Sequence, residues 1–105
     1  MPAPKTSAAL FAALGDETRL RLVFRLREGP LSMAKLTAGA KITRQAIAKH
    51  LLVLERARLV HGVRQGRERH WQLDRRHLDD ARRYLDLISK QWDNALGRLR
   101  EFVEE

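Results

Sequence analysis

Polar side chains recur along one face of a predicted helix near the middle of the 105-residue chain. Within residues 42–60, Gln45, Lys49 and Arg56 fall on the same side when residues are spaced about 100° apart around a helix axis. The opposite side is apolar and is expected to be buried: Ile47, Leu51 and Leu54. A glutamine amide can bond the edge of adenine, and lysine or arginine can bind guanine or phosphate. The pattern indicates a helix that presents nucleic-acid-binding groups to solvent.

A basic β-hairpin is predicted directly after this helix. Residues 59–64 and 69–73 are rich in strand-forming types, and the glycine-containing segment 65–68 between them favours a turn. Three arginines lie at or beside the turn: Arg64, Arg67 and Arg69. Guanidinium groups at a hairpin tip can contact phosphates. We therefore expect the helix and the hairpin to form one surface that binds a polyanion.

The charge of the chain agrees with such a surface. The formal net charge is +8, and residues 43–76 hold nine Lys and Arg against three acids, whereas residues 77–105 hold five against seven. This asymmetry indicates a basic centre and a separate role for the C-terminal segment. The chain has no cysteine, which excludes disulfides and thiolate chemistry and fits the cytoplasm. There is no apolar run of about 18 residues and no leader pattern, so we expect no membrane association.

Three short helices are predicted before the polar helix, over residues 7–14, 16–28 and 32–40. Asp16 and Ser32 are typical N-cap residues for the second and third of them. In the second helix the expected buried stripe is Leu20, Val23, Phe24 and Leu26, with Leu22 nearby. The first six residues are expected to be a flexible tail, so that the folded domain spans residues 7–105.

One long helix is predicted from about residue 75 to 103. Its apolar residues follow a heptad, with Leu78, Leu85, Trp92 and Leu99 at one position and Ala81, Ile88, Ala95 and Phe102 at the other. A domain this small has too little core to cover both ends of so long a helix. We therefore expect a homodimer, with these residues at the interface: Leu78, Leu85, Ile88, Trp92, Leu99 and Phe102.

The predicted order of elements is that of a winged helix–turn–helix, a mainly α fold with a two-stranded β-hairpin wing. At this point the chain resembles the ArsR-type winged-helix repressors over nearly all of residues 7–103. "ALGDETRLRLVFRL" (Ala13–Leu26) is similar to the N-terminal signature of that family. "ITRQAIAKHLLVLERARLV" (Ile42–Val60) is similar to its recognition-helix pattern, and "VRQGRERHWQL" (Val63–Leu73) to its wing. Three matching blocks in the right order make the resemblance specific.

The resemblance implies a sequence-specific transcriptional regulator. We expect a homodimeric repressor that binds a near-palindromic site in double-stranded DNA through the helix at 43–57 and the wing at 64–69. The residues expected to contact DNA are Thr43, Arg44, Gln45, Lys49, Arg56, Arg64, Arg67 and Arg69. The sequence leaves open whether a small-molecule or protein effector controls this binding.

The chain departs from the family pattern at two positions near the wing. Family members usually have glycine at the position of Arg58, where the helix ends in a left-handed residue. Arg58 must therefore adopt that conformation, or the turn must differ. Leu52 lies where a polar residue is more usual.

This chain lacks part of each set of metal ligands that members of the family use. Founding members sense metals through cysteines on the helix before the recognition helix, and residues 30–40 contain no thiol. Others use Asp and His pairs on the C-terminal helix. Asp74 and His77 are present, but no second His or Glu follows at a matching spacing. The resemblance therefore implies a subgroup that does not sense metals, and we expect no metal and no cofactor.

Two other classes of function compete with DNA binding. A winged-helix protein-interaction module would use the long C-terminal helix to bind a partner protein, and heterodimerisation in place of self-association would favour it. An enzyme would need a catalytic constellation, and no hydroxyl–His–acid set or glycine-rich phosphate loop is present. The four histidines are scattered without ligand spacing: His50, His61, His70 and His77. We expect no enzymatic activity.

Three more residues have roles that the sequence only partly defines. Arg19 is expected to form an ion pair or to contact a phosphate, and both alternatives stay open at this point. His50, beside the buried face of the polar helix, is expected to be partly buried and hydrogen-bonded. Trp71 is expected to belong to the core at the base of the wing.

Overall fold

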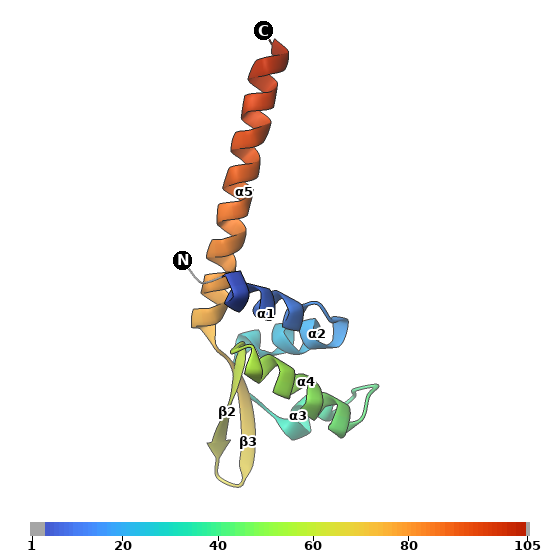
Figure 1. Cartoon of the computed structure of the whole chain (residues 1–105). Coiled ribbons are helices and arrows are strands. Elements are labelled where there is room, and N and C mark those ends of the chain that lie inside the picture. Colours follow the sequence, from blue (N-terminus) through green and yellow to red (C-terminus); the bar gives the residue numbers. More distant parts are fainter. Residues whose placement is uncertain (1–3, 105) are drawn as a thin grey trace.

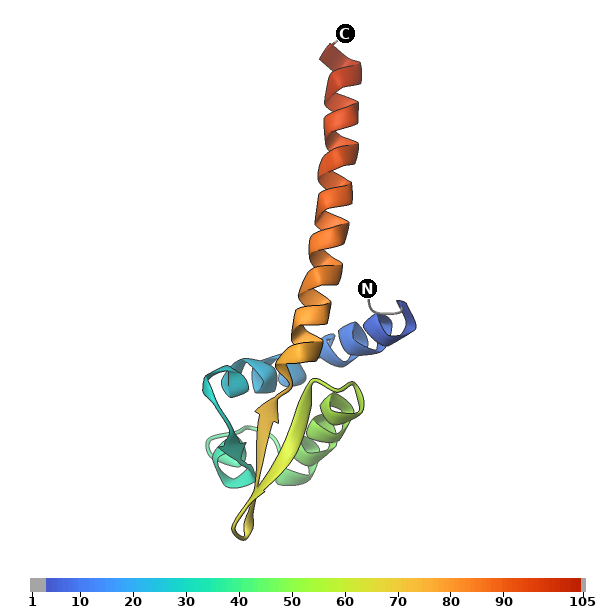
Figure 2. The ribbon, with the colours of Figure 1, turned by 90° about the vertical axis from the view of Figure 1, so that its left-hand side faces the viewer.

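The computed structural model describes residues 4–104, and one long helix projects from their helical domain (Figure 1). The elements in chain order are α1 (Pro4–Leu14), α2 (Glu17–Arg25), the 3-10 turn η1 (Leu26–Glu28), β1 (Leu31–Ser32), α3 (Met33–Thr37), α4 (Arg44–Arg56), β2 (Val60–Gln65), β3 (Glu68–Leu73) and α5 (Arg75–Glu104). In two views at right angles, α1 and α2 lie between α4 and the projecting part of α5. The β2–β3 hairpin projects from the domain in the direction away from α5 (Figures 1 and 2). The predicted winged helix–turn–helix order is confirmed.

The structure differs from the sequence prediction at the first helix and at one strand. Helix α1 begins at Pro4, so residues 4–6 of the predicted tail are helical, and residues 1–3 of that tail lie outside the described residues. The short strand β1 was not predicted. It pairs antiparallel with β3, with Leu31 opposite Trp71, which gives the strand order β1-β3-β2. Two residues carry no periodic signal, and only pairing with a distant segment makes them a strand.

The hairpin is longer and its turn tighter than predicted. Strands β2 and β3 pair from Val60 opposite Leu73 to Gln65 opposite Glu68, which leaves only Gly66 and Arg67 in the turn. Gly66 has a φ of 62°. A positive φ at the first of two central residues suits the right-handed twist of the strands, and glycine adopts it without a steric cost.

The core forms where α2, α3, α4 and the sheet meet. Its least exposed large side chains are Leu26, Leu36, Ile47, Leu51, Leu54, Leu59 and Val60. The predicted buried face of α4 and the core position of Trp71 are therefore confirmed. The predicted stripe of α2 is wrong in part, because Leu22 is buried while Leu20 and Phe24 are 53% and 64% exposed. Several apolar residues of α2 are four apart, and only packing against α4 selects which face turns inward.

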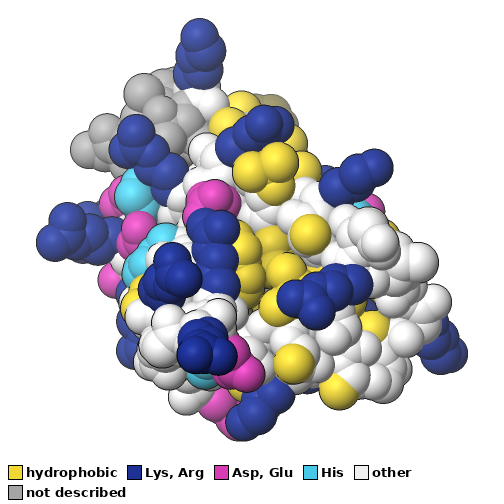
Figure 3. Space-filling view, turned by 90° about the horizontal axis from the view of Figure 1, so that it is seen from below, with side chains coloured by type: hydrophobic (Ala, Val, Ile, Leu, Met, Phe, Trp, Pro, Cys, Tyr) yellow, Lys and Arg dark blue, Asp and Glu magenta, His cyan; other side chains and the backbone are white. Residues whose placement is uncertain are grey.

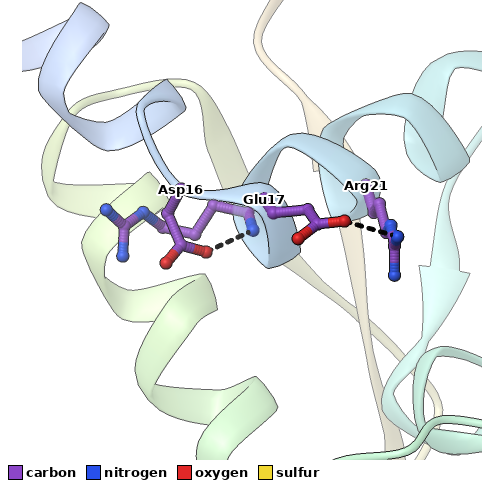
Figure 4. Close-up of polar contacts among 4 residues, drawn as sticks. Asp16, Glu17 and Arg21 are labelled. Atoms are coloured by element: carbon purple, nitrogen blue, oxygen red, sulfur yellow. Dashed lines mark hydrogen bonds and ion pairs between the residues drawn. The ribbon is translucent and has the colours of Figure 1, made fainter.

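Side chains cap the N-termini of three helices, α2, α3 and α4. Asp16 accepts a hydrogen bond from the backbone N–H of Arg19 at 3.0 Å (Figure 4), Ser32 accepts one from Lys35 and Thr43 one from Ala46. The bond from the Arg19 N–H holds the pKa of the Asp16 carboxyl below its ordinary value.

Helix α5 divides into a packed part and a free part. Leu78 and Ala81 pack on the core of their own domain, and the ring centroids of Phe11 and Tyr84 are 6.1 Å apart. Beyond this point the heptad residues are largely exposed: Leu85, Ile88, Trp92, Leu99 and Phe102. Leu78, predicted at the dimer interface, thus contributes to the monomer core. None of the helices in residues 4–104 has the length and apolarity that crossing a bilayer requires.

The chain leaves α4 through a Schellman motif in which Arg58 takes the left-handed conformation, with φ of 61°. The N–H of Arg58 donates to the carbonyl of Glu55, and the N–H of Leu59 donates to the carbonyl of Leu54, both at 2.9 Å. Leu54 and Leu59, the two positions that usually form the apolar pair of this motif, are both buried. The sequence departure at Arg58 is therefore accommodated by strain and not by a different turn.

Replacing Arg58 by glycine should stabilise the protein. We expect Arg58→Gly to raise the free energy of unfolding by up to about 1 kcal/mol, because glycine lacks the Cβ that disfavours a positive φ. Urea unfolding would measure this change. Lys49→Gly, on the exposed face of α4, is the control and should lower stability by about 1 kcal/mol. A loss of stability in Arg58→Gly would show that the Arg58 side chain itself stabilises the turn.

Candidate nucleic-acid interface

The N-terminal half of α4 presents its polar residues to solvent. Burial of Ile47 and Leu51 fixes the rotation of the helix about its axis. The predicted residues Thr43, Arg44, Gln45 and Lys49 are consequently all exposed. Seen from the side of the wing, Lys and Arg side chains are spread over this side of the molecule, with hydrophobic and acidic side chains among them (Figure 3). The structure thus leaves these four candidate residues accessible at the N-terminal half of α4.

A groove of about 600 Å³ separates α4 from the wing. Its lining from α4 includes Arg44, Leu52 and Glu55, and its lining from the hairpin includes Arg67 and Arg69. The fold thus brings the first residue of α4 and the tip of the wing to one hollow, although they are distant in sequence. Leu52, which replaces the more usual polar residue, is part of this lining.

Arg56 lies apart from the other candidates. It is the last residue of α4, about 16 Å along the axis from Gln45 at 1.5 Å per residue. It lines a shallow hollow with residues of α1, among them Ala9 and Ala12.

The three wing arginines differ in their surroundings. Arg64 and Arg67 are exposed, and among the described residues neither takes part in an ion pair. Arg69 is also exposed, but its guanidinium lies 4.5 Å from the ring centroid of Trp71 and its Nη2 is 3.4 Å from Oε2 of Glu55. Two wing arginines are therefore available to a ligand, while the third is held by the protein itself.

Arg19 ties α1 to α4, and among the described residues it forms no close ion pair, while its predicted phosphate contact stays a prediction. Its Nε donates to the carbonyl of Ala13 at 2.6 Å, and its Nη2 donates to the carbonyl of Ala12 at 3.4 Å. Its Nη1 lies 3.4 Å from Nδ1 of His50. His50 is half-buried, as predicted. Arg19 thus satisfies carbonyls at the C-terminus of α1 that have no partner within the helix.

The acidic and histidine side chains form no metal cluster in the part of the chain that the structure describes. Oδ2 of Asp74 lies 3.3 Å from Nδ1 of His77 at the start of α5. Burial raises the pKa of Asp74, but its hydrogen bond and charge interaction with His77, together with backbone N–H groups, outweigh burial and lower that pKa. Asp74 and His77 thus contact each other at the N-terminus of α5, where the helix dipole favours a carboxylate.

Glu55 and Gly62 belong to this surface but were not predicted from the sequence to do so. Gly62 lies in β2, and the Arg69 side chain crosses it. A glycine inside a strand is a known signal of close approach by another group, so Gly62 could have been noticed from the sequence. Glu55 carried no such signal, because its partner comes from another element.

The chain is similar to helix–turn–helix proteins in sequence and in structure. A family model described as a helix–turn–helix domain matches residues 14–63. The HTH-type transcriptional regulator Rv2034 of Mycobacterium tuberculosis is 37% identical over 92 residues, which cover 88% of this chain and 83% of the relative. The HTH-type transcriptional repressor SmtB of the same species is 30% identical over 87 residues, covering 83% of this chain and 63% of that protein.

A solved structure extends the likeness to the whole fold. The ArsR-like transcriptional regulator from Rhodococcus sp. RHA1 superposes with a TM-score of 0.82 at 35% identity, over 93% of this chain and 92% of that one. The match therefore includes the long C-terminal helix as well as the helix–turn–helix and the wing.

Replacing Arg19 should loosen the support of α4 without changing the exposed surface. We expect Arg19→Met to lower the free energy of unfolding by about 1–2 kcal/mol, because carbonyls of α1 lose a charged donor. Arg21→Met is the matched control, since among the described residues Arg21 pairs only with exposed Glu17 (Figure 4), and it should change stability by less than about 0.5 kcal/mol. If thermal unfolding gave the same loss of stability for both variants, Arg19 would not support α4 in the way described.

Proposed function

Because the chain belongs to the ArsR-type family of winged helix–turn–helix transcriptional regulators, we propose that it is a homodimeric repressor of a near-palindromic DNA operator. The family consists of regulators and not of enzymes. The observation that carries the proposal is the groove where the N-terminus of α4 and the wing tip meet, with exposed basic side chains on both walls. In cells, such a regulator would act in the cytoplasm, and its bound dimer would block RNA polymerase.

The proposed contacts divide by position. Arg44, Gln45 and Lys49, near the start of α4, would enter the major groove, where Gln45 can bond adenine in a bidentate manner. Thr43 caps α4 and stands at the same end, so its hydroxyl and the free N–H groups there suit a phosphate. The remaining contacts, to phosphates, would come from Arg56, Arg64 and Arg67.

The proposed dimer uses the free part of α5. Trp92 and Phe102 are 65% and 77% exposed in the single chain, and they belong to the same apolar seam. Exposing a continuous apolar stripe to water is unfavourable, and pairing with a second copy would bury it. Two recognition helices held by such a pair would reach half-sites about 34 Å apart, one turn of DNA.

Specific binding tests the proposal directly. Fluorescence anisotropy at physiological salt would compare a duplex from upstream of the protein's own gene with an unrelated duplex of equal length. We expect a preference of about a thousandfold or more, as specific regulators show. Replacing Gln45 and Lys49 together by alanine should abolish the preference, because these side chains would read the bases.

Lys90→Ala is the control for lost charge, since it removes one exposed lysine from α5, and it should leave the preference intact. Equal, salt-sensitive binding of the wild type to both duplexes would contradict the proposed operator.

The oligomeric state tests the α5 seam. Sedimentation equilibrium should give twice the 12.1 kDa chain mass for the wild type. We expect Trp92→Glu combined with Ile88→Glu to give a folded monomer, because both side chains are exposed in the single chain and a charge in the paired seam is costly. Leu87→Glu lies off the seam and should remain dimeric. A monomeric wild type would contradict the homodimer and favour a different protein as the partner of α5.

A further inference from the structure

The side chain of Arg69 joins three elements near the middle of the wing. Arg69 projects from β3 on the face that also carries Trp71, and its guanidinium stacks on the Trp71 ring. The guanidinium then reaches across β2 to Glu55 of α4. The crossing point is Gly62, where a Cβ would overlap Nε of Arg69 and lie 2.8 Å from its Nη2. The path of this side chain thus depends on the missing side chain at Gly62.

We propose that Arg69 is a positioning residue that fixes the wing against the recognition helix. Gly62 leaves the space that its side chain crosses, and Glu55 binds its guanidinium. This deepens the proposed function and rests on it, because the angle between α4 and the wing decides which phosphates the wing reaches. It also replaces the sequence-based assignment of Arg69 as a DNA contact. We refer to Arg69, Gly62 and Glu55 as the latch.

The position of the latch explains why it is needed. The base of the hairpin is fixed by burial of Val60 and Trp71, whereas the residues from Arg64 to Arg69 are exposed. Six residues per strand extend about 20 Å, so a small rotation at the base moves the tip by several ångströms. Arg69 lies opposite Arg64, beyond the buried base, and its bond to Glu55 opposes that rotation.

Charge supports the same assignment. Glu55 lines the groove that DNA would approach, and an unpaired carboxylate there would repel phosphates. Arg69 neutralises it from the wing side. An arginine that is stacked on a ring and paired with a carboxylate has fewer free N–H donors for a phosphate than the unpaired Arg64 or Arg67. The ion pair is exposed and contributes little to folding, so the latch should act on wing geometry and not on stability.

Gly62→Ala separates positioning from direct contact, because it displaces the guanidinium while retaining every charge. We expect specific affinity for the operator to fall about tenfold, with the slope of log affinity against log salt unchanged. Arg64→Met is the control, and loss of one phosphate contact should reduce that slope by about one. Arg69→Met should match Gly62→Ala, and the double variant should lose no more than either single variant. Additive losses, or a reduced slope in Arg69→Met, would overturn the latch and make Arg69 a DNA contact.

Glu55→Gln gives opposite expectations under the two assignments. If Arg69 is a latch, the variant should bind the operator more weakly, because the wing is released. If Arg69 contacts DNA, the variant should bind more tightly, because a repelling carboxylate is gone and the guanidinium is free. Tighter binding would therefore overturn the proposal.

A measurement without DNA keeps this test independent of the operator. Amide hydrogen exchange of residues 63–70 should rise several-fold in Gly62→Ala, Glu55→Gln and Arg69→Met, and should stay unchanged in Arg64→Met. Raised exchange with no specific DNA binding would support the latch while contradicting the proposed function. Unchanged exchange in all three latch variants would overturn the latch whatever the DNA measurements give.

Discussion

Burial of one face of α4 is the constraint on which both functional surfaces depend. Leu51 and Leu54 are fully buried, and they fix the helix in rotation, so that its polar residues can only face outward. The same packing orients the end of the helix, where buried Leu59 follows the left-handed Arg58. The direction in which the chain enters the wing is thus set by the core under α4.

The link continues from the wing to α5. The backbone N–H of Asp74 donates to the carbonyl of Leu59 at 2.8 Å, which joins the end of the hairpin to its beginning just before α5 starts. Leu78 and Ala81 then anchor the first turns of α5 in the same core. The surface proposed for DNA and the seam proposed for dimerisation are therefore parts of one packed unit.

The exposed apolar residues show how this small domain distributes its hydrophobic surface. Leu20 and Phe24 of α2 remain outside the core, and the guanidinium of Arg27 lies 3.7 Å from the Phe24 ring centroid. The larger uncovered surface is on α5, beyond Tyr84, whose ring lies beside that of Phe11 of α1. A core formed by about a dozen residues cannot cover a helix of 30 residues, so most of α5 extends past the domain.

The sequence by itself determined the helix order, the capping residues Asp16 and Thr43, the buried face of α4 and the heptad of α5, because periodicity and caps are local properties. Tertiary structure alone decided which face of α2 turns inward, that two residues form β1, and that Arg19 donates to carbonyls of α1. It also decided that Arg69 meets Glu55 across Gly62. Each of these depends on how distant elements pack, and residue spacing along one element carries no information about that.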